Sequence, residues 1–285
     1  MSDIIGSTVL RARVTVDGER ASYLTVERDG PAVLLLHGTY WSRVWLPVLE
    51  RLAGAGLRPF AVDLPGLGRS GGELTPETGT VPALAGWVAR FASALGLSGP
   101  VAVAGHDIGG AVAQHLLVHD GPEVSRLALV GSVTYDSWPV PGVARFRDPA
   151  VVAATTADEI LAARRRAVAE ALAGAATERR IAEYLDPWTD ARVRRSWMAL
   201  VAAADHRHTR DLLPALRRDP TPKLLVWGED DGFQKVEYAE RFASEIPHTT
   251  LLRLPGAGHI PMENAPDRVA RALADFFTAE GPGER

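Results

Sequence analysis

Residues 103–110, VAGHDIGG, form a pattern that could hold a nucleophile. An apolar run leads into Gly105 and Asp107, and Gly109 follows two positions later. Glycines at these positions permit a sharp turn from a strand into a helix, which lifts the side chain between them clear of the backbone. Asp107 would lie at a helix N-terminus, where backbone N–H groups favour its ionised form. An aspartate at this position can instead serve only to cap the helix. The residues at the ends of the other predicted strands must therefore distinguish a catalytic role from a capping role.

A second polar segment follows the apolar run 32–36, which is succeeded by His37, Gly38 and Thr39. A backbone N–H in this segment, that of Thr39, could pair with the N–H of Ile108. Two N–H groups aimed at one oxygen form an oxyanion hole, which stabilises negative charge in a transition state.

Two more predicted strands end in residues that could complete a catalytic triad. The run 223–227 leads into Gly-Glu-Asp-Asp, which ends at Asp231, and the run 250–254 leads into Pro-Gly-Ala-Gly and His259. The chain order is nucleophile, acid, histidine. Each motif alone is weak, but their order at successive strand ends favours nucleophilic catalysis by Asp107 over a capping role.

Short apolar runs alternate with amphipathic stretches along most of the chain. The predicted strands are 9–16, 21–26, 32–36, 60–62, 101–104, 127–133, 223–227 and 250–254. The predicted helices are 44–52, 81–95, 111–118, 236–246 and 267–277. The first two strands favour an antiparallel hairpin, and the later ones favour a mostly parallel sheet covered by helices. Reactive groups in such an α/β fold lie at the carboxyl ends of the strands.

Between residues 135 and 213 no run predicts a strand. The helical patterns here are 158–173, 178–185 and 191–204. We therefore expect a helical cap, residues 135–213, inserted after the sixth strand and dividing the core into residues 1–134 and 214–285. The arginine clusters 164–166 and 192–195 are expected on solvated helix faces.

Over residues 9–277 the chain resembles the α/β-hydrolase superfamily. The segment 63–70, DLPGLGRS, matches a turn-forming loop common in that superfamily. The G-H-D-x-G motif resembles the branch with an aspartate nucleophile, which includes epoxide hydrolases, haloalkane dehalogenases and haloacetate dehalogenases. The W-G-x-x-D pattern of the family implies Asp231 as the triad acid, with Asp136 as the alternative, and His259 as the base.

A carboxylate nucleophile selects the substrate by its chemistry. Attack of Asp107 on a carboxylic ester would give an anhydride as reactive as the substrate, whereas displacement at an sp³ carbon gives an ordinary alkyl ester. Water activated by His259, which Asp231 orients, can hydrolyse that ester. We therefore predict opening of an epoxide to a diol. A haloalkane dehalogenase with the same intermediate is the alternative, and a non-hydrolytic or ligand-binding protein of the same fold is the second alternative.

The leaving group decides between the first two hypotheses. An epoxide oxygen needs a proton donor, for which the candidates are Tyr184, Tyr40 and Tyr135. A halide needs N–H or ring-edge contacts, for which the candidates are Trp41, Trp138, Trp188 and Trp197. Ile108 and Ala111 stand where the resemblance implies a halide-binding tryptophan or carboxylate-binding arginines. These departures favour an epoxide, disfavour a small anionic substrate, and indicate a bulky, largely apolar one.

The composition excludes other classes. The 285 residues are 46% hydrophobic and 23% charged with a formal net charge of -4, so the chain can bury a full core and has no basic field for nucleic acid. It has no cysteine and no apolar segment long enough to span a membrane. We expect a cytoplasmic enzyme that acts on a small molecule and needs no cofactor or metal. A homodimer is compatible with the sequence, which does not fix the oligomeric state.

Overall fold

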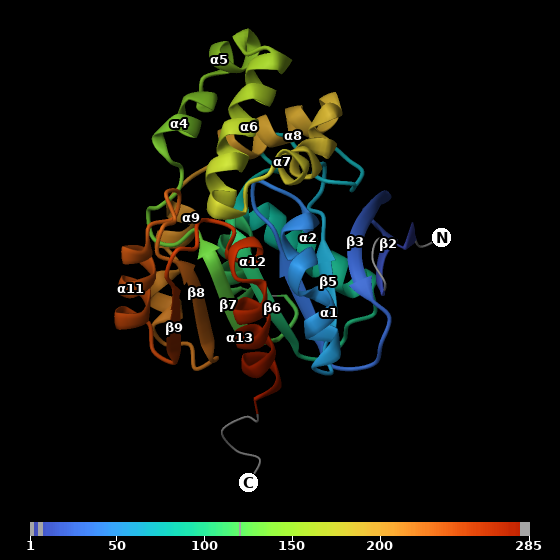
Figure 1. The fold of residues 1–285 in the computed structure, drawn as a ribbon, viewed down its shortest axis with the longest axis vertical. Coiled ribbons are helices and arrows are strands. Elements are labelled where there is room, and N and C mark those ends of the chain that lie inside the picture. The colour runs from blue at the N-terminus through green and yellow to red at the C-terminus, as the bar shows by residue number, and fades with distance from the viewer. Residues whose placement is uncertain (1–2, 5–7, 120, 280–285) are drawn as a thin grey trace.

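The computed structural model describes residues 3–4, 8–119 and 121–279. Within these ranges nine strands form one sheet in the order β1-β2-β3-β5-β4-β6-β7-β8-β9 (Figure 1). Their bounds are β1 Asp3–Ile4, β2 Val9–Val16, β3 Glu19–Val26, β4 Ala32–Leu36, β5 Arg58–Val62, β6 Val101–Asp107, β7 Val124–Ser132, β8 Lys223–Gly228 and β9 Thr249–Leu254. The strands from β5 across to β9 are parallel, and the first three are antiparallel, as the apolar runs predicted.

The β2–β3 hairpin turns on two residues, Asp17 and Gly18, which both have positive φ. An Asp-Gly pair suits such a tight turn because its backbone twist matches that of the two strands. The sequence analysis located eight of the strands, and β1 is an addition of only two residues.

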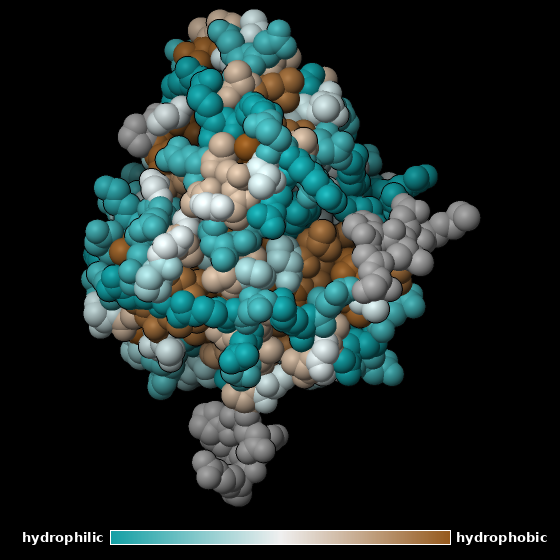
Figure 2. Space-filling model, viewed as in Figure 1, coloured by the Kyte–Doolittle hydropathy of each residue, from teal (hydrophilic) through white to brown (hydrophobic). Residues whose placement is uncertain are grey.

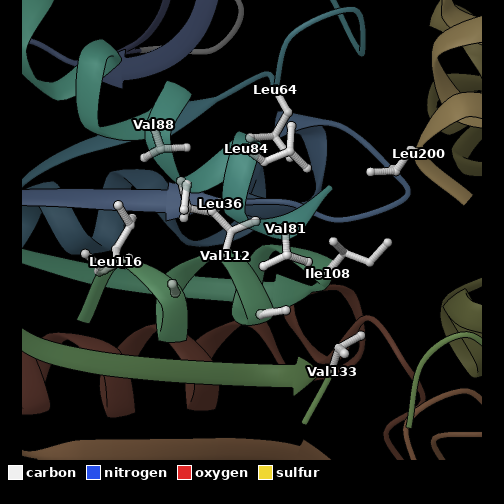
Figure 3. Close-up of a cluster of buried hydrophobic side chains, with 14 of the residues drawn as sticks. Leu36, Leu64, Val81, Leu84, Val88, Ile108, Val112, Leu116, Val133 and Leu200 are labelled. Atoms are coloured by element: carbon white, nitrogen blue, oxygen red, sulfur yellow. The ribbon is translucent and has the colours of Figure 1, made fainter. Parts of the chain in front are cut away.

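Side chains that alternate along the parallel strands enter two separate apolar cores, one on each face of the sheet. Helices α2 (Val81–Ala94), α3 (Ile108–Val118) and α11 (Val236–Glu245) cover one face, and α1 (Leu46–Gly54) and α13 (Pro266–Thr278) cover the other (Figure 1). Figure 3 shows the first core, where Leu36 from β4 packs among side chains of α2 and α3. Burial on both faces explains why the central strands are continuous apolar runs.

A helical insertion, α4 to α8, lies between β7 and β8 in the chain and above the carboxyl ends of the strands (Figure 1). Its helices are α4 Pro141–Ala144, α5 Pro149–Ala154, α6 Ala157–Leu172, α7 Glu178–Leu185 and α8 Ala191–Ala202. The last three match the predicted helical patterns. Three further short helices were also not predicted: α9 Arg207–Arg210 and α10 Leu213–Leu216 follow α8 in the chain, and α12 Pro261–Asn264 follows β9.

In Figure 2, hydrophilic residues cover most of the insertion and of the helices in front of the sheet, with smaller hydrophobic groups between them. No helix in the described part of the chain is long and apolar enough to cross a membrane.

Candidate active site

Asp107 is the last residue of β6, and α3 begins at the next residue. Its backbone has φ 55° and ψ -128°, a strained conformation that costs about 1–3 kcal/mol and that its surroundings must enforce. A Cβ on Gly105 would lie 2.4 Å from the Gly109 carbonyl oxygen, and one on Gly109 would lie 2.4 Å from the Leu36 carbonyl oxygen. Both flanking residues must therefore be glycine for the strand and helix to meet at Asp107.

One carboxylate oxygen of Asp107 is held by Thr39. The Thr39 backbone N–H and its hydroxyl Oγ1 each donate to Asp107 Oδ2 at 2.9 Å. A Cβ on Gly38 would lie 2.5 Å from both Oδ2 and the Ile108 nitrogen. Only glycine at position 38 therefore lets residues 37–39 approach the turn between β6 and α3. Among the described residues the other oxygen, Oδ1, accepts no hydrogen bond. The side-chain donor of Thr39 was not predicted, because the sequence pattern indicates only the backbone donors.

The Ile108 side chain points into the core and not toward the Asp107 carboxylate. It is 1% exposed and lies close to Val81 in Figure 3, which also shows Val133 nearby. Its backbone nitrogen and Asp107 Oδ2 both lie 2.5 Å from the position that a Cβ on Gly38 would take.

His259 and Asp231 form a buried pair, with 2.9 Å between His259 Nδ1 and Asp231 Oδ2. The other oxygen of the acid, Oδ1, accepts from the backbone N–H groups of Phe233 and Gln234, both at 2.8 Å. Burial alone would lower the pKa of His259, but the charge of Asp231 and its hydrogen bond outweigh burial and raise that pKa above 6.5. The alternative acid, Asp136, is exposed.

Two residues that the sequence analysis did not assign to the site hold this pair. Gly131 has φ 47°, and a Cβ there would lie 3.0 Å from the His259 carbonyl oxygen and 3.2 Å from Asp231 Oδ2. His106 Nε2 lies 2.8 Å from the His259 carbonyl oxygen and must donate, because a carbonyl only accepts. Burial and the nearby His259 lower the pKa of His106 to about 4, so His106 is neutral at pH 7.

A cavity of about 250 Å³ lies between these residues and the helical insertion. Asp107, His259, Thr39 and Tyr40 line its floor, and the insertion contributes mostly apolar side chains, namely Val143, Phe146, Ile160, Ala163, Ala167 and Trp197. The mostly apolar lining is compatible with the largely apolar substrate that the sequence analysis expected.

The candidate leaving-group residues separate into two sets. Tyr40, Trp138 and Trp197 line the cavity. The hydroxyl of Tyr184 instead donates to Glu263 at 3.1 Å, which Arg43 also binds. The remaining candidates, Tyr135, Trp41 and Trp188, are buried outside the residues that line the cavity.

Arg164 also lines the cavity, although the sequence analysis expected its cluster on a solvated helix face. It is 6% exposed, whereas Arg165 and Arg166 on the next positions of α6 are exposed. The signal was present in the spacing, since Arg164 lies four residues after Ile160 and four before Val168, on the buried side of the helix. That expectation is wrong for this one arginine.

The described residues contain no group of three His, Cys, Asp or Glu side chains arranged to bind a metal ion.

Comparisons with known proteins identify a family model, related sequences and structures of the same fold. A family model described as the alpha/beta hydrolase family matches residues 33–272. The chain is 29% identical over 268 residues to haloalkane dehalogenase 2 of Mycobacterium bovis, covering 88% of this chain and 89% of that protein. It is 31% identical over 271 residues to a pimeloyl-[acyl-carrier protein] methyl ester esterase of Xanthomonas campestris, covering 90% and 99%. The solved structure of the epoxide hydrolase CorEH superposes with a TM-score of 0.78 at 24% identity, covering 94% and 98%.

Proposed function

The chain belongs to the alpha/beta hydrolase family, and on that premise we propose that it opens an epoxide to a diol through an alkyl ester on Asp107. One observation carries the proposal. Thr39 presents two donors to one oxygen of Asp107, and His259, oriented by Asp231, lines the same cavity.

In the first step the free oxygen of Asp107, Oδ1, attacks a ring carbon. The new C–O bond forms as the ring C–O bond breaks, and the ring oxygen takes the electron pair and a proton. The carboxylate needs no base for this attack, because it is already ionised. The donors of Thr39 hold Oδ2 and so orient the carboxylate toward the cavity.

In the second step His259 takes a proton from water, and the resulting hydroxide adds to the carbonyl carbon of the ester. The negative charge of the tetrahedral intermediate develops on Oδ2, where Thr39 already donates twice. Collapse expels the diol oxygen, which takes the proton back from His259. Asp231 stabilises the imidazolium between these two transfers.

Tyr40 is the tyrosine that we assign to protonate the ring oxygen. It lines the cavity beside Asp107, and burial raises its pKa above its usual range, so its hydroxyl carries a proton at pH 7. The ring oxygen takes that proton, and Tyr40 recovers one from the carboxylic acid of Asp107 after ester hydrolysis. We propose that the helical insertion acts as a cap that excludes bulk water from this cavity.

The similarity to an esterase does not favour ester hydrolysis here. Attack by a carboxylate on an ester would form an anhydride, which is as reactive as the ester substrate, so the covalent intermediate would not make hydrolysis easier. A haloalkane substrate remains the second candidate because of the similarity to a dehalogenase, and because Trp138 and Trp197 line the cavity. A protein that only binds ligands is the third hypothesis.

The test uses His259→Gln, which leaves the first step intact and blocks the second. We expect intact-mass spectrometry to show one alkyl group on Asp107 after incubation with a small epoxide. His248→Gln, a substitution of the exposed His248, serves as control and should turn over without an adduct. Diol release from epoxides, compared with halide release from bromoalkanes of the same carbon skeleton, separates the first two candidates. An adduct with neither class, with ligand binding unchanged in Asp107→Ala, contradicts the enzyme proposal.

A further inference from the structure

We propose that Arg164 is a further catalytic residue, which binds the negatively charged atom that leaves when Asp107 is alkylated. This inference rests on the proposed function. The ligand it implies is a small anion, either the alkoxide oxygen of an opened epoxide or a halide.

Arg164 lies in the cavity wall and, among the described residues, forms no ion pair with a carboxylate. Its NH2 nitrogen donates to the Thr39 carbonyl oxygen at 3.0 Å, and none of the ion pairs described for residues 8–119 and 121–279 includes it. The guanidinium carbon lies 4.6 Å from the ring centre of Trp188, 5.4 Å from that of Trp197 and 5.1 Å from that of Tyr40. Aromatic faces hold a cation in position but do not neutralise its charge.

Thr39 connects this cation to the nucleophile. Its N–H and hydroxyl bind Asp107, while its carbonyl accepts from Arg164. Arg164 and Asp107 are therefore both hydrogen-bonded to Thr39, and both line the cavity. The guanidinium lies beside the reaction and not at the far end of the substrate.

Charge balance in the cavity changes during the reaction. In the free enzyme the negative charge of Asp107 faces the positive charge of Arg164. Alkylation converts Asp107 into a neutral ester, so the cavity keeps a buried cation and gains the negative charge of the departing atom. A buried cation without an anion is costly, and the departing anion restores the balance at the moment when it forms.

Tyr40 and Arg164 would both act on the ring oxygen of an epoxide. The ring oxygen receives the electron pair of the broken C–O bond and a proton from Tyr40, which leaves a tyrosinate. Arg164, stacked against the Tyr40 ring, stabilises the alkoxide before transfer and the tyrosinate after it. Arg145, which also lines the cavity, is exposed and cannot provide a desolvated charge there.

The kinetic test measures formation of the Asp107 adduct in the His259→Gln background. Arg164→Gln should slow alkylation by an epoxide about 100-fold, as expected for loss of one preorganised donor. Alkylation by the bromide of the same skeleton should slow by less than about 10-fold, because a less basic leaving group needs less stabilisation. Arg164→Lys should recover part of the epoxide rate, and Arg166→Gln, an exposed position on the same helix, should retain it.

A matched binding test does not depend on turnover. Asp107→Asn imitates the uncharged ester, and the tryptophans beside Arg164 report on a bound anion. We expect iodide to quench the fluorescence of Asp107→Asn saturably, and Asp107→Asn/Arg164→Gln to lose this saturable phase while its melting temperature shows that it is folded.

Three results would overturn the inference. One is an equal loss of epoxide and bromide rates in Arg164→Gln. Another is a rise in KM confined to substrates that carry a carboxylate, with kcat unchanged, which would make Arg164 an anchor for the substrate. The third is iodide binding that survives Arg164→Gln. Absence of any adduct while iodide still binds through Arg164 would instead contradict the proposed function and leave the anion site established.

Discussion

Replacing Asp231 by asparagine removes one charge, keeps the size of the side chain and has a predictable consequence. Oδ1 of Asp231 accepts from the N–H groups of Phe233 and Gln234, so the amide oxygen of the asparagine must occupy that position. The amide NH2 then faces His259 Nδ1, which must accept a hydrogen bond. The imidazole proton consequently moves to Nε2, which can no longer take a proton from water.

The expected size of this effect follows from the role of the histidine. A triad histidine held in the wrong tautomer typically loses about 10⁴-fold in rate, or ~5.5 kcal/mol of transition-state stabilisation. Only ester hydrolysis needs the histidine as base, so alkylation of Asp107 should continue. Asp231→Asn should therefore accumulate the adduct from the wild-type nucleophile, with a single-turnover hydrolysis rate lowered about 10⁴-fold.

Rapid-quench mass spectrometry measures both steps in one experiment. The control is Asp230→Asn, the same substitution at the preceding exposed position, which should hydrolyse its ester at the wild-type rate. A hydrolysis rate in Asp231→Asn within about 10-fold of the wild type would refute the assignment of Asp231 as the residue that sets the tautomer.

Other perturbations should have smaller effects. Gly131→Ala should lower the free energy of unfolding by about 1–3 kcal/mol in chemical denaturation, because its φ is positive and its Cβ would crowd the His259–Asp231 pair; a loss below that range would contradict the tight packing. Thr39→Val keeps the N–H but removes the hydroxyl donor, so stopped-flow ester hydrolysis should slow about 10-fold. Ester hydrolysis should rise with pH as His259 loses its proton, with an inflection above 6.5, because its pKa is raised in the folded enzyme. Unfolded His106 binds a proton near its ordinary pKa of 6.5, whereas folded His106 does so only near 4. Lowering the pH from 6.5 to 5 should therefore cost about 1.6 kcal/mol of stability through this residue, and His106→Gln should remove that contribution.

Periodicity in the sequence predicted the sheet well, because central parallel strands must be apolar on both faces. The join between β6 and α3 was less predictable. The strand was expected to end at residue 104 and the helix to begin at 111, whereas β6 continues to Asp107 and α3 starts at Ile108. Asp107 pairs with Ser132 of β7 although its φ is positive. Local residue preferences do not predict that a strand continues through such a residue.

The residues of the insertion show where sequence reasoning fails for the site. Tyr184 and Tyr40 are equally plausible proton donors as residue types, but Tyr184 is directed to Glu263, which lies 79 positions away in the chain. Arg164 was assigned to a solvated face by its charge, although its spacing from Ile160 favoured burial. Such placements depend on how the insertion packs on the sheet, and neither composition nor local pattern determines that packing.

The central claim is that Asp107 is the nucleophile, and a single turnover in heavy-oxygen water tests it most directly. If an alkyl ester forms on Asp107 and water attacks its carbonyl carbon, one heavy oxygen remains in the carboxylate of Asp107 and the diol carries none. Peptide mass spectrometry of residues around Asp107 should show this label after one turnover with excess enzyme. Heavy oxygen in the diol, with an unlabelled Asp107, would mean that water attacks the substrate directly and would contradict the covalent mechanism.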